Sequence, residues 1–182
     1  NLEENAATTT AVKETTGMKL YYQGELAENY YYSTSCGYGT DTGIWKSENE
    51  PISYIRPGKL ASEETRQNAQ RAEDMSVEEN FAAYIRTVDE NDFESGEPWY
   101  RWQYEVNEID IDGLLGRGQK RYQANAALIQ TRKEGADGAY YVSEPVEDIG
   151  ELQNIEISKR GPGGIADEML ITGSEAVIKV IS

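Results

Sequence analysis

Residues 11–45 constrain the fold most, because they form the one long run that reads as two strands joined by a tight turn. Apolar and polar side chains alternate over residues 17–22, which is typical of a strand with one buried face. The turn is expected at residues 23–25, since Gly24 tolerates the positive φ that tight turns require. The residues that follow, 28–35, are rich in tyrosine, serine and threonine and predict the second strand. An ordinary sheet edge has the same composition, so this pattern alone does not identify a site.

A second set of alternating segments, near the end of the sequence, predicts an antiparallel meander. Strands are expected at residues 152–159, 165–172 and 176–181. Glycine-rich turns are expected between them, at residues 161–164 and 173–174.

Two helices are predicted in the middle of the sequence. Residues 61–74 are strongly charged, and Ser62 is the expected N-cap of a surface helix. Residues 75–88 carry an apolar stripe at helical spacing, and Ser76 with Glu79 predicts a capping box at the start of that helix.

The segment between these helices and the meander is less regular. Residues 98–106 are predicted to be a strand, and Asn107 is expected to cap a short helix that two glycines weaken. Residues 118–134 fit a helix or a strand equally well. A turn is expected at residues 135–138 and a brief strand at 139–142.

Together these segments predict one α+β domain with an antiparallel-sheet-rich core and a few surface helices. A chain of 182 residues is long enough to bury the core of one such domain. Residues 1–10 are expected to be a linker or lead-in, and residues 58–97 a helical, acidic insertion.

The charge of the chain excludes several kinds of partner. Its 33 acidic and 17 basic residues give a formal net charge of −16. Nucleic-acid binding needs a basic surface, so no nucleic-acid partner is expected. The sequence has no apolar run of about 18 residues, so no membrane span is expected in this chain.

Histidine is absent from the sequence, and Cys36 is its one cysteine. Without histidine these residues cannot form a histidine-dependent triad, and with one cysteine they cannot form an internal disulfide.

Two further segments leave alternatives open. The acidic residues 89–96 have side chains that suit Ca²⁺, but they lack the glycine and terminal glutamate of an EF-hand loop, so a solvated loop is expected. Tryptophan and tyrosine stand next to Arg101 in residues 98–106. Such aromatic groups occur in sugar-binding clefts and also in ordinary cores and sheet edges.

A longer motif runs through the predicted hairpin. It reads AVKETTGMKLYYQGE, then AENYYYSTSCGYGTD, and then Trp45. With these residues the sequence resembles the SpoIID/LytB family, which combines stage II sporulation proteins with amidase enhancers. Cys36 stands where most members have the first glycine of a pair, as in a cysteine-containing subgroup, and the match is closer to the sporulation branch. The terminal meander resembles the family as well.

The resemblance implies part of a secreted peptidoglycan lytic transglycosylase. In the sporulation branch one glutamate acts as general acid and base, and the 6-hydroxyl of the sugar closes on C1. That glutamate lies in an upstream family segment that these residues do not contain. The chain is therefore expected to be the C-terminal part of a single SpoIID-like domain, with no catalytic residue and no activity alone. The resemblance assigns substrate binding to Tyr32, Ser33, Thr34, Ser35, Gly37 and Trp45.

The resemblance also implies a role for Cys36. In cysteine-containing members this thiolate belongs to a zinc site with a second cysteine and a histidine. The present chain supplies one thiol and no histidine, so Cys36 is expected to bind zinc only if an upstream segment supplies the other ligands. Otherwise it is a lone, partly buried thiol, and no other cofactor is expected.

A non-catalytic alternative stays open, namely a cell-wall-binding or amidase-activating module. For both functions the expected partners are peptidoglycan glycan strands and other sporulation or cell-wall hydrolases. The expected location is extracytoplasmic, in a Gram-positive type of cell envelope, with the protein secreted or anchored by a segment outside these residues.

Overall fold

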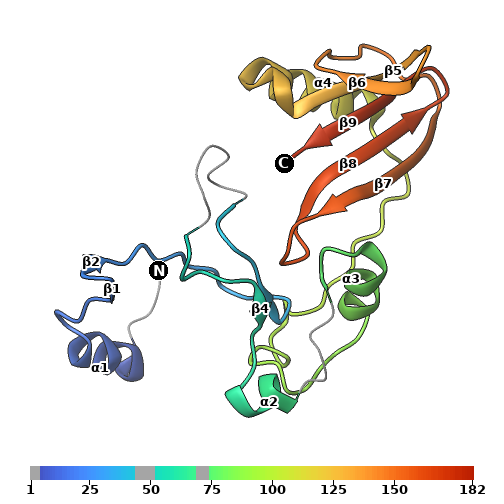
Figure 1. Ribbon diagram of the computed structural model, residues 1–182. Coiled ribbons are helices and arrows are strands. Elements are labelled where there is room, and N and C mark those ends of the chain that lie inside the picture. The colour runs from blue at the N-terminus through green and yellow to red at the C-terminus, as the bar shows by residue number, and fades with distance from the viewer. Residues whose placement is uncertain (1–4, 44–51, 69–73) are drawn as a thin grey trace. The chain divides into compact units, whose positions relative to one another are not determined.

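The computed structural model describes residues 5–43, 52–68 and 74–182, and the chain forms two compact units (Figure 1). The N-terminal unit is Asn1–Ser33 and the main unit is Thr34–Ser182. The predicted fold class is confirmed, because helices accompany antiparallel sheets and the largest sheet has five strands.

The N-terminal unit begins with a helix. Helix α1, Ala6–Glu14, starts where the Asn5 side chain accepts a hydrogen bond from the amide of Thr8 at 3.0 Å. This is the interaction that favours asparagine at helix N-caps. Part of the predicted linker is therefore helical rather than extended.

The predicted hairpin is present but much shorter than expected. Strand β1, Tyr21–Tyr22, pairs with β2, Glu25–Leu26. Gln23 and Gly24 have φ angles of 52° and 90°, which fit a type I′ turn. Residues 28–35 belong to no strand, so the predicted second strand is wrong. Alternation forms a strand only where a neighbour supplies backbone partners, and none of the described residues of this unit is buried.

The five-stranded sheet of the main unit has the order β6-β5-β9-β8-β7 (Figure 1). Every neighbouring pair is antiparallel. The predicted meander is confirmed as the last three strands, and the predicted brief strand is confirmed as β6. The strands are β5 Ile129–Gly135, β6 Gly138–Val142, β7 Leu152–Arg160, β8 Ala166–Gly173 and β9 Val177–Ile181.

Helix α4, Ile111–Ala124, packs against this sheet. Asp110 caps it by accepting a hydrogen bond from the Gly113 amide at 2.9 Å, so the predicted cap at Asn107 is wrong. The helix has 14 residues instead of the expected few, because burial of its apolar face outweighs the helix-propensity cost of its glycines. It covers a core of four buried isoleucines: Ile129, Ile149, Ile171 and Ile178.

The ambiguous segment 118–134 changes structure at Asn125. This residue ends α4, and its side chain accepts a hydrogen bond from the Ala127 amide at 3.0 Å, which starts the short 3₁₀ helix Ala126–Leu128. Strand β5 follows at once, so both interpretations of the segment are partly correct.

Residues 34–101 contain short elements. Strand β3, Tyr38–Gly39, pairs with β4, Gly58–Lys59. Helix α2, Glu63–Asn68, follows Ser62, whose hydroxyl accepts a hydrogen bond from the Thr65 amide at 3.1 Å, as the predicted N-cap requires.

Helix α3, Glu78–Ile85, lies within the predicted helix but is shorter. Its N-cap is Val77, which makes no capping hydrogen bond from its side chain, so the predicted capping box is wrong. The hydroxyl of Ser76 donates instead to Asp74 at 2.7 Å. Asp74 precedes the helix and competes for the serine as a charged acceptor.

Residues 98–106 form turns and irregular chain, so the strand predicted there is wrong. Tyr100 is buried with 2% of its surface exposed, while Trp99 and Trp102 on either side are 69% and 70% exposed. The segment is therefore held by individual side chains and not by a strand ladder.

Candidate functional site

A groove of about 450 Å³ with a mixed polar and apolar lining lies in the main unit, beside the residues that follow Cys36 and Gly37. Thr40, Asp41 and Gly43 form one part of its lining, and the β7–β8 turn forms another. The two parts touch closely, because a Cβ added to Gly163 in the turn would collide with Thr40. The remaining lining residues are Lys159, Gly161, Pro162, Asp167, Glu168, Ile181 and Ser182.

Internal hydrogen bonds fix the backbone of the first wall. Thr42 is fully buried, and its hydroxyl accepts a hydrogen bond from the amide of Ile52 at 2.9 Å. Asp41 accepts one from the amide of Gly43 at 3.0 Å. The wall therefore presents a fixed carboxylate to the groove instead of a mobile loop.

The groove is acidic, with one lysine to balance its carboxylates. The Lys159 ammonium lies 4.0 Å from the carboxylates of both Asp167 and Glu168. Glu168 is also 3.4 Å from the ammonium of Lys179. Such a lining offers many hydrogen-bond acceptors and suits a ligand that is rich in hydroxyl or amino groups.

The predicted substrate-binding residues fall into three groups. Tyr32 and Ser33 are exposed at the end of the N-terminal unit. Thr34 and Ser35 are partly buried, and Gly37 is buried, at the start of the main unit. Thr34, Ser35 and Gly37 are neighbours in the sequence itself, and none of the five described residues lines the groove. Trp45 lies outside the described residues.

Ser35 is committed to the fold. Its amide donates to Oε2 of Glu94 at 2.8 Å, and its hydroxyl donates to the same oxygen. The same hydroxyl accepts a hydrogen bond from the amide of Gly37 at 3.0 Å. Ser35 therefore shapes residues 34–37, which we call the motif segment. Its contacts leave its hydroxyl little capacity to bind a ligand.

The backbone of Cys36 is held from the other side. Its carbonyl accepts hydrogen bonds from the Tyr84 hydroxyl at 3.1 Å and from Arg101 at 2.7 Å. Arg101 also donates to the carbonyl of Thr87 at 2.7 Å, and its guanidinium stacks 3.9 Å from the ring centre of Tyr100. A planar guanidinium suits this combination of fixed hydrogen bonds and stacking.

A buried carboxylate, Asp92, organises these contacts. Its Oδ2 accepts hydrogen bonds from the hydroxyls of Tyr84 at 2.7 Å and Tyr100 at 2.6 Å. Its Oδ1 receives no hydrogen bond, but the ammonium of Lys59 lies 3.2 Å away. A Cβ on Gly37, whose φ is +88°, would collide with this carboxylate. We call Lys59, Tyr84, Asp92, Tyr100 and Arg101 the Asp92 cluster.

Proton affinities in the Asp92 cluster follow from burial and charge. Burial and the hydrogen bonds to Asp92 raise the pKa of Tyr84 and of Tyr100. Partial burial alone would lower the pKa of Lys59, but its hydrogen bond to Asp89 and the nearby carboxylate of Asp92 outweigh this effect and raise it. The hydrogen bond from Lys59 lowers the pKa of Asp89 to about 2.

The acidic segment 89–96 was expected to be a solvated loop, and this expectation is wrong for Asp92, which is 2% exposed. The apolar stripe of the predicted helix at residues 75–88 includes Tyr84, and the stripe gave no sign that the hydroxyl of Tyr84 would bind a buried carboxylate. The signal in the sequence for a buried carboxylate was an acidic run with several tyrosines and arginines close to it. Among the described residues, no group of three or more histidine, cysteine or acidic side chains could hold a metal ion.

The surroundings of Cys36 bear on its predicted role as a zinc ligand. Its thiol is partly buried, and its nearest polar contact is a weak one, from Sγ to the carbonyl of Tyr38 at 3.9 Å. Since the part of the chain that the structure describes places no further metal-binding side chains around it, these residues do not form a zinc site by themselves.

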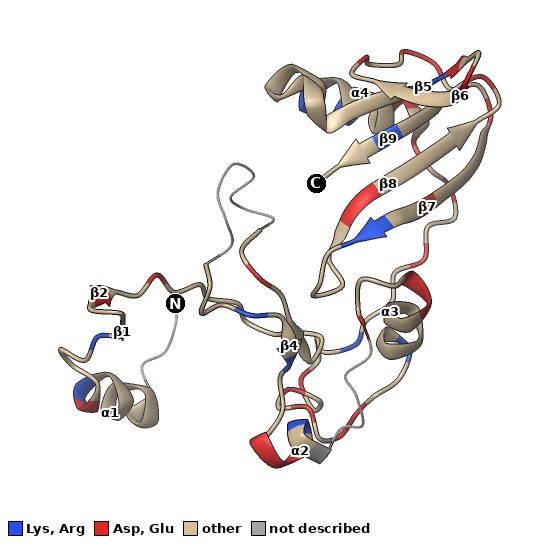
Figure 2. Ribbon diagram, in the orientation of Figure 1, with Lys and Arg blue, Asp and Glu red and all other residues tan. Residues whose placement is uncertain are grey.

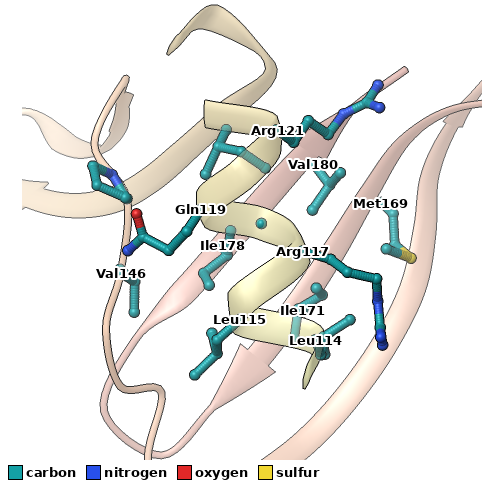
Figure 3. A pocket seen from close by; sticks show the side chains of 13 residues that line it. Leu114, Leu115, Arg117, Gln119, Arg121, Val146, Met169, Ile171, Ile178 and Val180 are labelled. Atoms are coloured by element: carbon teal, nitrogen blue, oxygen red, sulfur yellow. The ribbon is translucent and has the colours of Figure 1, made fainter. Parts of the chain in front are cut away.

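A second cavity, of about 180 Å³, lies between α4 and the sheet (Figure 3). Leu114 and Leu115 of the helix face Ile171 and Ile178 of the sheet across it. The cavity reflects incomplete filling of the core beneath a glycine-containing helix.

Comparison with protein-family models, with curated proteins and with solved structures gave no match. None of the helices that the structure describes has the length and apolar content needed to cross a bilayer.

Proposed function

We propose that this chain is part of a SpoIID-like lytic transglycosylase and binds peptidoglycan glycan strands. The observation that carries the proposal is the groove beside the motif segment, with Thr40 and Asp41 on its wall and both polar and apolar groups in its lining. The residues from Tyr32 to Cys36 are exposed or partly buried and are not sealed in an apolar interior. The groove lies next to the predicted binding residues in the sequence, and Thr40 and Asp41 extend the same stretch onto its wall.

The chemistry of the groove supports a sugar ligand. Its carboxylates and hydroxyls accept hydrogen bonds from sugar hydroxyl and amide groups, and Pro162 and Ile181 supply apolar contact. The formal net charge of −16 disfavours polyphosphates, including nucleic acid. A glycan chain with few negative charges is the polymer that fits both properties.

We place the proton donor outside these residues. In the proposed reaction a glutamic acid protonates the glycosidic oxygen and the bond from C1 to that oxygen breaks. The 6-hydroxyl oxygen then bonds to C1 and returns its proton to the glutamate. A general acid needs a raised pKa, whereas the carboxyl pKa values that shift among the described residues are lowered, at Glu63, Asp74 and Asp89.

The second candidate is a non-catalytic wall-binding or amidase-activating module. The contacts of Ser35 and Cys36 favour it, because they position the backbone of these residues and give their side chains no part in a reaction. Both candidates act on the cell wall, so we propose an extracytoplasmic location in a Gram-positive type of envelope, with other wall hydrolases as partners.

Sedimentation with purified, peptide-free glycan strands tests binding, and mass spectrometry of the soluble products tests cleavage. We expect the chain to co-sediment and to release no anhydromuramyl ends. The variants Thr40→Val and Asp41→Asn should weaken binding because each changes a group on the groove wall. The matched control is Ser158→Ala, an exposed residue of β7 outside the groove lining.

Each outcome decides between the candidates. A robust yield of anhydromuramyl ends from this chain alone would show that the proton donor lies within it. Absence of binding by the unmodified chain would refute the proposal. Added amidase that becomes faster in the presence of the chain would favour the activating module.

A further inference from the structure

Residues 98–106, which we call the aromatic segment, expose three large rings in a short stretch. Trp99, Trp102 and Tyr104 are 69%, 70% and 79% exposed. Tyr100, between the tryptophans, is only 2% exposed. Three large exposed rings within six residues are more than the single scattered apolar side chains that an ordinary surface carries.

The aromatic segment is pinned at its centre, so its exposure does not reflect a loose chain. The Tyr100 hydroxyl donates to the buried Asp92 at 2.6 Å. Arg101 donates to the carbonyls of Thr87 and Cys36, each at 2.7 Å. The two indoles flank these anchors in the sequence, and the side chains that fix the aromatic segment are those that fix the motif segment.

The sequence around the exposed rings, residues 97–110, is acidic apart from Arg101. The guanidinium of Arg101 is occupied by backbone carbonyls and by the ring of Tyr100. Residues 102–110 contain acidic residues and neither lysine nor arginine, and Figure 2 colours the acidic residues of the chain red. Glu97 lies on the other side, and it is exposed, as are Glu105 and Glu108. Aromatic faces attract cations, and neighbouring carboxylates add to that attraction while they repel phosphate groups.

We propose that the aromatic segment binds glycan residues that carry a free amino group, in preference to N-acetylated ones. This inference rests on the proposed function, which supplies the glycan, and charge complementarity supplies the specificity. A protonated amino sugar presents an ammonium to the indole faces and the carboxylates. An N-acetyl group carries no charge, and so it gains only hydrogen bonds and apolar contact.

The test compares two oligosaccharides of equal length, one of β-1,4-linked glucosamine and one of β-1,4-linked N-acetylglucosamine. Calorimetry and tryptophan fluorescence are measured at mildly acidic pH, where the sugar amines are protonated and exposed carboxylates are largely ionised. We expect the glucosamine oligomer to bind about tenfold more tightly. The preference should shrink as salt is added, because salt screens exposed charges.

Variants identify the surface. Trp99→Ala and Trp102→Ala should each reduce the preference, and the double variant should abolish it. Trp102→Phe should keep most of it, because phenylalanine retains an aromatic face. Glu105→Gln should reduce it without changing the rings. The matched control is Tyr140→Ala, which removes a ring that is 51% exposed on β6.

The outcomes separate this inference from the proposed function. Equal binding of the two oligomers, or a preference unchanged in the double tryptophan variant, overturns the inference and leaves the glycan function standing. Absence of binding by either oligomer overturns the inference, and sedimentation with peptide-free glycan strands then decides separately whether the glycan function stands. A lysine oligomer that binds as tightly as glucosamine and displaces it shows a general cation surface, which also overturns the inference.

Discussion

Two regions of the main unit are stabilised by different physical means. Around the motif, residues 34–101 depend on the Asp92 cluster, in which a carboxylate, an ammonium and two tyrosine hydroxyls meet with little exposure. Between α4 and the sheet, stability depends on apolar burial, with Ile149 fully buried and Ile129 2% exposed. The first set of contacts is directional and sensitive to protonation, and the second is neither.

The difference teaches where precision is needed. Apolar side chains hold a helix on a sheet while tolerating small shifts, as the cavity beneath α4 illustrates. Hydrogen bonds from Tyr84 and Arg101 instead fix one carbonyl, that of Cys36, at stated distances of 3.1 and 2.7 Å. A segment that presents groups to a ligand benefits from the second kind of support.

The two regions can be followed separately. The tryptophans are Trp45, Trp99 and Trp102, so the sequence of the sheet region contains none. Tryptophan fluorescence therefore reports on residues 34–106, and circular dichroism at strand wavelengths is dominated by the sheet. Fluorescence thus measures unfolding of the motif region, and circular dichroism measures unfolding of the sheet.

The largest effect is expected for Asp92→Ala. It leaves the hydroxyls of Tyr84 and Tyr100 without their charged acceptor, and each hydrogen bond to a charged group is worth about 1.5–3 kcal/mol. Lys59 also loses the nearby carboxylate of Asp92 but keeps its ion pair with Asp89. Urea denaturation followed by tryptophan fluorescence measures the loss. Asp92→Asn is the matched control and should cost less, since it keeps an acceptor for the tyrosines. A loss below about 1 kcal/mol for Asp92→Ala contradicts the importance of the cluster.

The next effect is expected for Ile171→Ala in β8. Ile171 is 3% exposed in the core under α4, and isoleucine-to-alanine changes at buried sites cost about 2–5 kcal/mol. We expect the lower half of that range, because the site adjoins an existing cavity. Circular dichroism in urea measures it, and Ile155→Ala, at a residue 38% exposed on β7, is the control. If Ile171→Ala shifts the fluorescence transition first, the two regions are not independent.

The smallest effect is expected from acid. The pKa of Asp89 is lowered from 3.8 to about 2 by its hydrogen bond with Lys59. A lowered pKa in the folded state contributes stability that is present above the ordinary pKa and is lost as the pH falls through about 2. Fluorescence-detected stability of the motif region should therefore decrease between about pH 4 and pH 2. Asp89→Asn should reduce this dependence, and an identical acid profile in that variant would contradict the assignment.

The sequence predicts the sheet region well for a physical reason. In β7, β8 and β9 the strand partners are close in sequence, and the turn at Gly161–Gly164 is marked by glycine and proline. Alternation and turn residues therefore carry most of the necessary information.

The motif region could be predicted only in part. The motif predicted substrate binding for Thr34, Ser35 and Gly37, and this role stays a prediction, while the structure shows Ser35 held by contacts within the fold. The contacts that hold them reach across long stretches of sequence, as from Ser35 to Glu94 and from Cys36 to Arg101. No periodicity encodes such pairs, because each one is a single side chain that meets a single backbone group.

The same reason explains the incorrect strands. Residues 28–35 and 98–106 alternate as strands do, but a strand needs a second chain segment at its edge, and alternation does not say whether one is present. In the aromatic segment, Tyr100 and Arg101 find fixed partners through their side chains instead.

The position of β9 has a consequence for how the sheet is made. β9 lies between β5 and β8, and without it the sheet separates into the hairpins β5–β6 and β7–β8. A ribosome produces both hairpins before it produces β9, and each can close early because its two strands are near neighbours in the chain. The nascent protein therefore carries two separate hairpins until Val177–Ile181 emerges and pairs with β5 and β8.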